Sequence, residues 1–348
     1  MIKRKGEIEL EKFLLDLVKK AYSEKRRLVA PLIGFPGVKM TGSTIKLAQQ
    51  NYGEHFKVLK NISKTFMPDV IFPLMDLSVE ANALGRFTVF PKGESATVIK
   101  DEFTLSDLEK LENVDITFDS RVLAYVETLS LMKSELPPFV FRGAYVTGPY
   151  TLAALLMGAE EAAVSTILHP EELHNVCKLA AKKILDYVEL LISSGAQIIC
   201  ILEPSAVMLG PHQFEQFSVQ YVRSISRVCE NASVASVYHI CGNTMHLVEI
   251  MAEAGVDALS LDSAEAGVNL PSVAEKIPGD VIITGNISPI GSLLRGKPGT
   301  VQKEVLQLLK SMESYPNFIL STGCDLPQET PLENIHAFMK AGRDYRFN

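Results

Sequence analysis

The hydrophobic residues of this chain form short continuous runs that alternate with longer stretches in which they recur every three or four positions. The continuous runs begin near residues 28, 69, 139, 197, 234, 258, 281 and 318. They have the length and the β-branched content of strands that are buried on both faces. The stretches between them, such as residues 53–65, 170–193 and 299–314, have the spacing of helices. Strands that alternate with helices in this way predict parallel βαβ units.

Eight such units that close on one another predict a (β/α)₈ barrel (TIM barrel), formed as a single domain by residues 1–348. An open doubly wound sheet is the alternative, but the chain has no Gly-x-Gly-x-x-Gly dinucleotide loop and no Walker phosphate loop. Residues 7–20 have an amphipathic pattern, so residues 1–26 are expected to form an N-terminal helical extension that packs on the barrel. Residues 35–43 are rich in Gly and Pro and are predicted to be a loop. The more polar residues 86–137 are predicted to be an insertion at the barrel edge.

Composition and charge are those of an ordinary globular protein. The 348 residues are 47% hydrophobic and 22% charged, and the net charge is −7 with scattered basic residues. This pattern does not suggest nucleic acid or an anionic membrane as a partner. No apolar run approaches the length of a membrane span, and the N-terminus lacks a signal-peptide core, so a cytoplasmic location is expected. The five cysteines are odd in number and widely spaced, which favours reduced thiols over a disulfide framework.

The candidate chemistry lies where two of the predicted strands end. His239 and Cys241 end one strand, and because strand side chains alternate between faces, these two project the same way. Cys324 follows the apolar run 318–322. An imidazole and two thiolates suit Zn²⁺, and three protein ligands leave one position open for substrate or water, as in catalytic zinc sites. The alternative is a set of packed side chains, since free cysteines are often small buried hydrophobes.

The topology of a (β/α)₈ barrel places its active site at the C-terminal ends of the strands. The zinc candidates all fall at such ends, and so do Asp76, Glu203, Asp262 and Asn286. We therefore expect these side chains to line one pocket. Asp76 is expected to be catalytic, with a helix cap as the alternative role. Glu203 and Asn286 are expected to contribute to cofactor binding.

Two kinds of chemistry use such an ion. In hydrolysis the ion activates water, and the usual sites are rich in His and carboxylate ligands. In thiol alkylation the ion holds the substrate sulfur as a thiolate near neutral pH, ready to attack an electrophilic methyl group. Two thiolate ligands donate enough charge to weaken the ion as a Lewis acid. The sulfur-rich ligand set therefore favours methyl transfer to a thiol.

Four runs of the sequence carry a family resemblance: residues 195–206, His239-Ile-Cys-Gly-Asn, residues 285–289 and residues 320–335. With them the chain resembles the uroporphyrinogen decarboxylase superfamily, and within it the methylcobamide:coenzyme M methyltransferase branch. The likeness extends over residues 28–342. The pairing of His-x-Cys-Gly with a late Thr-Gly-Cys is its most specific feature.

The resemblance implies a (β/α)₈ fold and a zinc ion held by His239, Cys241 and Cys324. It also implies zinc-dependent transfer of a methyl group from a methyl-Co(III) corrinoid to a thiol such as coenzyme M. The chain lacks the Asp-x-His-x-x-Gly cobalamin-binding signature, so the methylcorrinoid is expected on a partner corrinoid protein. Zinc-dependent relatives often use a carboxylate as a fourth ligand. The resemblance points to Glu265 for this role, with Asp262 as the alternative.

The sequence departs from the decarboxylase pattern of the same superfamily. The Arg-Gln-Ala-Gly-Arg loop of the decarboxylases is replaced by residues 34–42, and their functional tyrosine and late histidine fall at Leu155 and Cys324. Of that set only Asp76 remains. Glu203 stands where the superfamily usually has Asp. These departures disfavour porphyrinogen decarboxylation.

Two other functions stay open at this point. One is a metal-free decarboxylase-like enzyme, and the other is a non-catalytic, zinc-containing subunit of a methyltransferase complex. The sequence identifies neither the acceptor thiol nor the oligomeric state. His246 is predicted to be structural. The remaining histidines are predicted to be surface groups, namely His55, His169, His174, His212 and His336.

Overall fold

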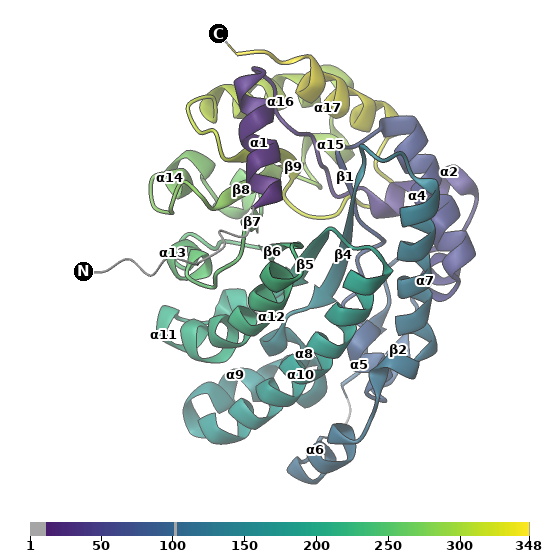
Figure 1. The fold of residues 1–348 in the computed structure, drawn as a ribbon, viewed down its shortest axis with the longest axis vertical. Helices are drawn as coiled ribbons and strands as arrows, with labels where there is room; N and C mark the ends of the chain where they lie inside the picture. Colours follow the sequence, from purple (N-terminus) through teal and green to yellow (C-terminus); the bar gives the residue numbers. More distant parts are fainter. Residues whose placement is uncertain (1–11, 101–102, 348) are drawn as a thin grey trace.

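The fold is built on a ring of parallel strands, described by a computed structural model for residues 12–100 and 103–347. The main sheet has the order β1-β4-β5-β6-β7-β8-β9, and all of its neighbouring pairs are parallel (Figure 1). These strands are β1 (Val70–Ile71), β4 (Phe141–Thr147), β5 (Ile198–Leu202), β6 (Ala235–Ile240), β7 (Ala258–Leu261), β8 (Ile282–Ile287) and β9 (Phe318–Thr322). The chain has the TIM-barrel fold expected from its sequence.

The remaining gap in the ring is filled by an extended segment at Val29. It forms a parallel bridge with Leu320 of β9, and the Ala30 N–H donates to the Leu320 carbonyl at 2.9 Å. On its other side, the Asp69 N–H donates to the Val29 carbonyl, and the Val29 N–H donates to Asp69 Oδ2 at 2.7 Å. The strand predicted to begin at residue 28 is therefore reduced to one bridge. That bridge joins β9 to the chain just before β1.

Helices surround the ring of strands (Figure 1). Those before β4 are α1 (Phe13–Ser23), α2 (Gly34–Thr41), α3 (Ile45–Gln50), α4 (Tyr52–Phe66), α5 (Val79–Ala83), α6 (Leu105–Glu112) and α7 (Ser120–Glu135). Those between β4 and β6 are α8 (Pro149–Met157), α9 (Ala159–Leu168), α10 (Pro170–Ser194), α11 (Pro211–Phe214) and α12 (Gln220–Asn231). Those after β6 are α13 (Val248–Ala252), α14 (Leu270–Ala274), α15 (Ser292–Arg295), α16 (Pro298–Ser311) and α17 (Leu332–Asp344).

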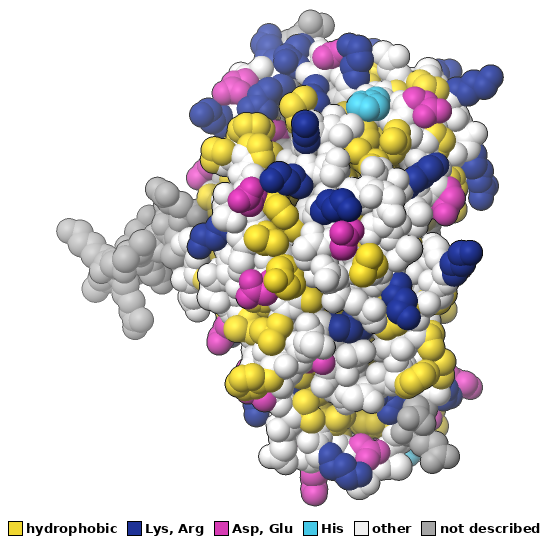
Figure 2. Space-filling model, turned by 90° about the vertical axis from the view of Figure 1, so that its right-hand side faces the viewer, with side chains coloured by type: hydrophobic (Ala, Val, Ile, Leu, Met, Phe, Trp, Pro, Cys, Tyr) yellow, Lys and Arg dark blue, Asp and Glu magenta, His cyan; other side chains and the backbone are white. Residues whose placement is uncertain are grey.

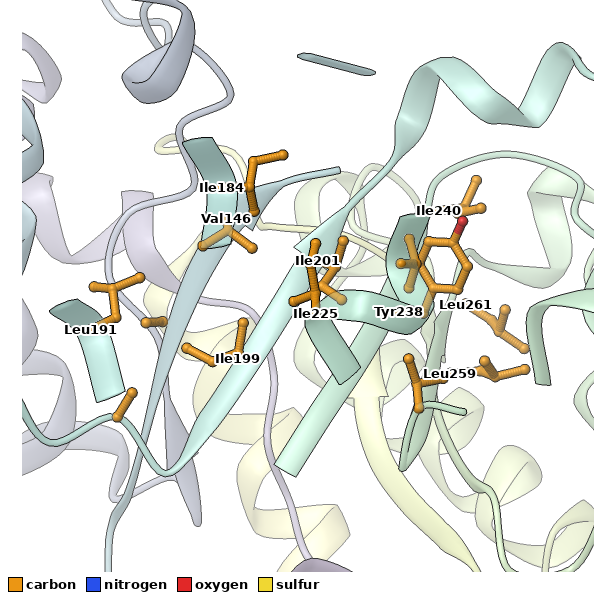
Figure 3. Packing of buried hydrophobic residues seen from close by; sticks show 14 of the residues in the cluster. Val146, Ile184, Leu191, Ile199, Ile201, Ile225, Tyr238, Ile240, Leu259 and Leu261 are labelled. Carbon is orange, nitrogen blue, oxygen red and sulfur yellow. The ribbon is translucent and has the colours of Figure 1, made fainter. Parts of the chain in front are cut away.

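Strand side chains that face outward form the core between the ring and the helices. On β5, Ile199 and Ile201 point outward and belong to the same buried cluster as Ile184 of α10 and Ile225 of α12 (Figure 3). Strands covered on this face by helices and on the other by the barrel interior read as continuous apolar runs. This double burial explains why the strands were visible in the sequence.

The inward-facing side chains of the strands form a second cluster, which also includes apolar side chains of α1. Leu14 and Val18 of α1 pack with Ile198 and Cys200 of β5 and with Val237 of β6. A cavity of about 30 Å³ is left among the interior side chains, which is small beside the volume of a ligand pocket. The interior is therefore a packed core. The first residues of the helix predicted over 7–20 lie outside the described residues.

Residues 35–43 were predicted to be a loop, and this prediction is wrong because α2 covers Gly34–Thr41. Pro36 lies in the first turn of α2, where a backbone N–H has no helical partner to lose. Gly37 is needed for close packing, since a Cβ there would lie 2.4 Å from Cδ1 of Ile62 in α4. These residues therefore serve helix initiation and helix packing rather than a turn.

The segment predicted to be an edge insertion contains two different parts. A short antiparallel hairpin, β2 (Thr88–Val89) with β3 (Thr97–Val98), and α6 stand apart from the main sheet. Helix α7, in contrast, contacts α4, α10 and β4 and buries eight of its side chains. The end of this segment thus belongs to the helical layer around the ring.

The surface of the face that carries α2, α4 and α7 mixes basic, acidic and apolar side chains (Figure 2). Among the described residues, no single helix is both long and apolar enough to cross a membrane. The bent pair α8 and α9 meets that test only as a pair, with 108° between its two helices.

Candidate metal centre

Strand β6 and the end of β9 place three ligand-type side chains at one point of the barrel mouth. Along β6, Val237 faces the interior, so His239 and Cys241, two and four residues later, lie on the same side. Cys324 follows β9 directly after Gly323. A side chain at Gly323 would press on the neighbouring loop, since its Cβ would lie 2.7 Å from the backbone nitrogen of Ser263. Gly323 therefore lets the chain bring Cys324 inward.

The three side chains lie in mutual contact. His239 Nε2 lies 3.1 Å from Cys241 Sγ and 3.7 Å from Cys324 Sγ, and the two sulfur atoms are 3.2 Å apart. His239 is 1% exposed, whereas both cysteines are half-buried. The imidazole therefore forms the floor of the cluster, and the two thiols form the side that solvent and ligands reach.

The neighbouring strand holds the imidazole in place. Ser260 of β7 pairs with His239 across the sheet, and Ser260 Oγ lies 2.9 Å from Nδ1. With its proton on Nδ1, the ring donates to this hydroxyl and keeps the Nε2 lone pair toward the sulfur atoms. A second partner of this kind is a regular feature of metal-binding histidines. The polar Ser260 inside the apolar run of β7 is a signal that the sequence contains but that strand periodicity alone does not interpret.

Asp262 lies near both loops that carry the thiols. Its Oδ2 accepts a hydrogen bond of 2.7 Å from the Gly242 N–H, next to Cys241. Its Oδ1 would lie 3.0 Å from a Cβ at Gly323, next to Cys324. Asp262 therefore fixes the loop that carries Cys241 and lies close to the loop that carries Cys324. Among the described residues, no carboxylate oxygen joins the cluster of His239, Cys241 and Cys324 itself.

Glu265, expected as a fourth ligand, lies elsewhere. It belongs to the short turn η4 (Ala264–Ala266), is exposed, and accepts a 2.7 Å hydrogen bond from the Ser288 hydroxyl. It lines a surface pocket together with Glu304 of α16. The structure thus brings Asp262 closer to the thiol loops than Glu265.

Asp76, expected to be catalytic, is held in a buried ion pair. Its Oδ2 accepts hydrogen bonds from Arg121 of α7, at 2.5 Å, and from the Tyr125 hydroxyl, at 3.1 Å. Its Oδ1 accepts from the backbone N–H and hydroxyl of Ser78. All of its acceptor sites face protein groups, and the structure does not bring it into the thiol cluster. Removing one member of such a buried pair is strongly destabilising.

His55 was predicted to be a surface group, and this prediction is wrong. It is 1% exposed, and its Nε2 accepts a 2.8 Å hydrogen bond from the Leu74 N–H. Burial lowers the pKa of His55 to about 3, so the ring stays neutral and keeps its acceptor. His55 therefore fixes the segment that leads to Asp76. The sequence predicts that His55 lies on a helix, but it does not show that this helix packs against the segment after β1.

Glu203 and Asn286, expected to bind cofactor, both contact backbone. Glu203 is fully buried at the N-terminus of α8, where it accepts from the Thr151 N–H and from the Ser218 hydroxyl. Burial raises the pKa of Glu203 to about 7. The Asn286 side-chain amide donates to the carbonyls of Asp262 and Val268 at 2.9 and 3.1 Å. Asn286 therefore holds the loop that contains Asp262.

The immediate surroundings of the cluster include a phenol and a carboxylate that the sequence did not single out. Tyr145 lies at an inward position of β4, and Asp325 follows Cys324. Burial raises the pKa of Asp325 to about 7, and burial together with nearby Asp325 raises the pKa of Tyr145 well above its usual value. A hydrogen bond with Cys241 and burial raise the pKa of the Cys324 thiol well above its usual value.

The cluster fits a zinc ion by its donor set and by its dimensions. A tetrahedral ion with bonds of about 2.3 Å to sulfur and about 2.0 Å to nitrogen separates neighbouring ligand atoms by about 3.5 to 3.8 Å. The observed separations are 3.1, 3.2 and 3.7 Å, so small side-chain movements suffice. A metal centre of one imidazole and two thiols is therefore compatible with the fold as it stands.

Comparisons with known proteins agree with this architecture. A family model described as uroporphyrinogen decarboxylase (URO-D) matches residues 39–345. The chain belongs to the uroporphyrinogen decarboxylase family. A solved structure of this fold, a methyltransferase from Methanosarcina mazei, superposes with a TM-score of 0.85 at 22% identity, over 95% of this chain and 97% of that one.

Relatives of this uroporphyrinogen decarboxylase family protein carry two different activities in their names. The methylcobamide:CoM methyltransferase MtbA of Methanosarcina mazei is 27% identical over 279 residues, which is 78% of each chain. The uroporphyrinogen decarboxylase of Methylobacillus flagellatus is 26% identical over 288 residues, covering 79% of this chain and 78% of the relative. Family membership and identity therefore establish the fold and leave the reaction to be decided by the site.

Proposed function

We propose that this protein is a zinc-dependent methyltransferase that moves a methyl group from a methyl-Co(III) corrinoid, carried on a partner protein, to a small thiol acceptor. The observation that carries the proposal is the contact of His239 Nε2, Cys241 Sγ and Cys324 Sγ at the barrel mouth. A metal-free decarboxylase has no need for two thiols beside an imidazole. Relatives named methylcobamide:CoM methyltransferases support the same reaction.

The zinc ion would supply a positive charge that keeps the acceptor sulfur deprotonated near neutral pH. Ser260 and Asp262 position the protein ligands, and the packed interior below His239 keeps water away from the floor of the site. The acceptor sulfur then forms a bond to the methyl carbon while the Co–C bond breaks. The electron pair of that bond remains on cobalt, which leaves as Co(I), and the thiol proton passes to solvent.

The other expected site residues take supporting roles in this proposal. Asp76 fixes the loop after β1 through Arg121, and Glu203 and Asn286 fix the segments that flank β6 and β8. With zinc held by His239, Cys241 and Cys324, the acceptor thiol would bind on the side that these three ligands leave open. Of the two carboxylates expected as a fourth ligand, we favour Asp262 over Glu265, because Asp262 accepts a hydrogen bond from the Gly242 N–H next to Cys241.

The experiment is a metal analysis of the purified wild type and of His239→Ala and Cys324→Ala, followed by a methylcobalamin-plus-thiol assay on the same samples. We expect about one zinc per chain in wild type and loss of both zinc and thiol methylation in both variants, because two of three ligands cannot hold the ion tightly. Cys229→Ala is the matched control, since Cys229 is buried in α12 away from the cluster and is expected to leave both properties intact.

Wild type that contains no zinc after preparation without chelators would refute the proposal. The second candidate function is decarboxylation, favoured by the family model and by relatives named uroporphyrinogen decarboxylase. Release of CO₂ from uroporphyrinogen by metal-free wild type would support that function instead. Zinc without methyl transfer in the presence of a methylated corrinoid protein would indicate a non-catalytic subunit.

A further inference from the structure

The two thiols of the metal centre are in direct contact, with 3.2 Å between the sulfur atoms of Cys241 and Cys324. A disulfide bond holds its two sulfur atoms about 2.05 Å apart, so this pair needs to close by only about 1.2 Å to be joined. The same two side chains that are placed to hold a metal ion are therefore also placed to form a covalent bond with each other.

The contact joins strand ends that are not neighbours in the ring. Cys241 follows β6 and Cys324 follows β9, and β7 and β8 lie between these strands in the sheet. Both cysteines lie beyond the last residue of their strand, and each has a glycine beside it, Gly242 or Gly323. Closing the gap therefore requires side-chain rotation and a small loop movement, and it leaves the pairing of the strands intact.

Solvent reaches these two thiols and hardly reaches the other three. Cys241 and Cys324 are half-buried, whereas Cys177, Cys200 and Cys229 are at most 2% exposed. Oxidation of cysteine depends strongly on access of the oxidant to the sulfur. A small oxidant in solution is therefore expected to react first at the metal centre.

We infer, on the basis of the function proposed above, that Cys241 and Cys324 form a reversible disulfide when the protein meets a peroxide, and that this bond switches the metal centre off. One thiol sulfur attacks hydrogen peroxide and becomes a sulfenic acid, and one molecule of water leaves. The second thiol sulfur attacks the sulfenic sulfur, the S–S bond forms, and a second molecule of water leaves. Each sulfur loses one electron, and the peroxide gains two.

The consequence follows from the ligand set. Cysteine binds a metal as a thiolate, and a disulfide sulfur carries no such charge. The oxidised cluster therefore keeps only His239 as a zinc ligand, which cannot hold the ion. A dithiol reduces the bond by thiol–disulfide exchange and becomes a cyclic disulfide itself. Both cysteines are then free to bind zinc again.

The test treats the zinc-loaded full chain, free of reductant, with hydrogen peroxide in the presence of a chromogenic zinc chelator. Absorbance reports the released zinc, and mass spectrometry of unreduced peptides with blocked free thiols identifies the bonded cysteines. We expect about one zinc to leave per chain, at the rate at which a Cys241–Cys324 disulfide forms. Dithiothreitol followed by zinc should restore both zinc binding and thiol methylation.

Two variants test the choice of the pair. Cys200→Ala is the matched control, because Cys200 is buried inside the ring on β5, and it is expected to release zinc as wild type does. Cys241→Asp replaces one thiol by a carboxylate, which is also a zinc ligand but cannot form a disulfide. We expect this variant to lose the disulfide and to release zinc more slowly than wild type. The peptide map of wild type gives the decision if Cys241→Asp does not bind zinc.

The possible results separate the switch from the function. Zinc release with sulfinic acids in place of a disulfide, a bond from Cys324 to Cys200, or thiols and zinc that peroxide leaves unchanged would each overturn the switch. Methylation by the reduced, zinc-loaded protein would still support the function in those cases. A Cys241–Cys324 disulfide with zinc release, in a protein that never methylates a thiol, would overturn the function and retain the switch. Wild type that binds no zinc would refute both.

Discussion

Buried carboxylates in this protein are stabilised in two different ways. Asp76 is paired with Arg121, so its charge is balanced within the protein. Glu80 of α5 is also buried, and among the described residues its carboxylate accepts hydrogen bonds from Thr147, from the N–H at 2.7 Å and from the hydroxyl at 2.8 Å. Burial, with a smaller contribution from nearby Asp76, raises the pKa of Glu80 to about 7. An uncompensated buried carboxylate favours the protonated form and makes folding sensitive to pH.

Glu80→Gln is expected to remove that sensitivity. The folded protein binds the Glu80 proton more tightly than the unfolded chain, so the contribution of Glu80 to stability is complete below about pH 4.5 and is lost as the pH rises through 7. Relative to wild type, Glu80→Gln should therefore gain about 2 to 3 kcal/mol in free energy of unfolding between pH 4.5 and pH 7.5. Urea unfolding at several pH values measures this difference.

The matched control is Glu135→Gln, which changes an exposed carboxylate that pairs with Lys60. Exposed ion pairs contribute little, so its stability relative to wild type should change by less than about 0.5 kcal/mol over the same pH range. A Glu80→Gln profile that runs parallel to that of wild type would show that Glu80 is ionised in the folded protein.

At the scale of helices and strands, the sequence predicts those elements whose pattern reports burial. Seven of the eight apolar runs became strands that begin within two residues of the expected positions, because parallel strands covered on both faces are apolar throughout. Helix α2 was missed because glycine and proline are read as breakers. In α2, Pro36 lies in the first turn and Gly37 packs closely against α4. These roles depend on tertiary structure, which the local sequence pattern does not report.

The convergence of the three candidate metal ligands was likewise predictable from strand alternation and barrel topology. His239, Cys241 and Cys324 lie at strand ends that the fold must bring to one mouth. The neighbours that tune the site were not predictable in the same way. Ser260 is beside His239 because of sheet register, and Tyr145 and Asp325 adjoin the cluster because of the way β4 and the loop after β9 meet in the fold. Both properties require coordinates.

Close packing of α2 on α4 is expected to make Gly37→Ala destabilising. Its Cβ would lie 2.4 Å from Cδ1 of Ile62 and 2.8 Å from Cγ1 of Val58, so these side chains or one of the two helices must shift. Overpacking of this kind costs about 1 to 3 kcal/mol. Gly299→Ala in α16 is the control, because a Cβ there meets nothing within 4 Å and alanine favours a helix. Equal thermal stabilities of the two variants would contradict the packing argument.

For the molecule as a whole, closure of the ring depends on the contacts of the Val29 segment with β9 and with Asp69, here called the seam. The seam has only one bridge to β9, but the residues that follow it form hydrogen bonds with the end of β9 and with Asp325. The Leu32 N–H donates to Thr322 Oγ1 at 3.0 Å, and the Gly34 N–H donates to Asp325 Oδ1. A weak seam would therefore loosen the end of β9 that carries Cys324.

Asp69→Ala is expected to open this seam, because it removes the acceptor for the buried Val29 N–H. An unpaired buried amide costs about 1 to 3 kcal/mol, and hydrogen exchange at Val29 and Leu320 should accelerate more than exchange within β5 and β6. Asp69→Asn retains an oxygen acceptor and should stay closer to wild type. Since the seam supports the end of β9, Asp69→Ala should also bind zinc more weakly than Asp69→Asn. Unchanged exchange at Leu320 in Asp69→Ala would show that the ring is held closed by its helices and not by this contact.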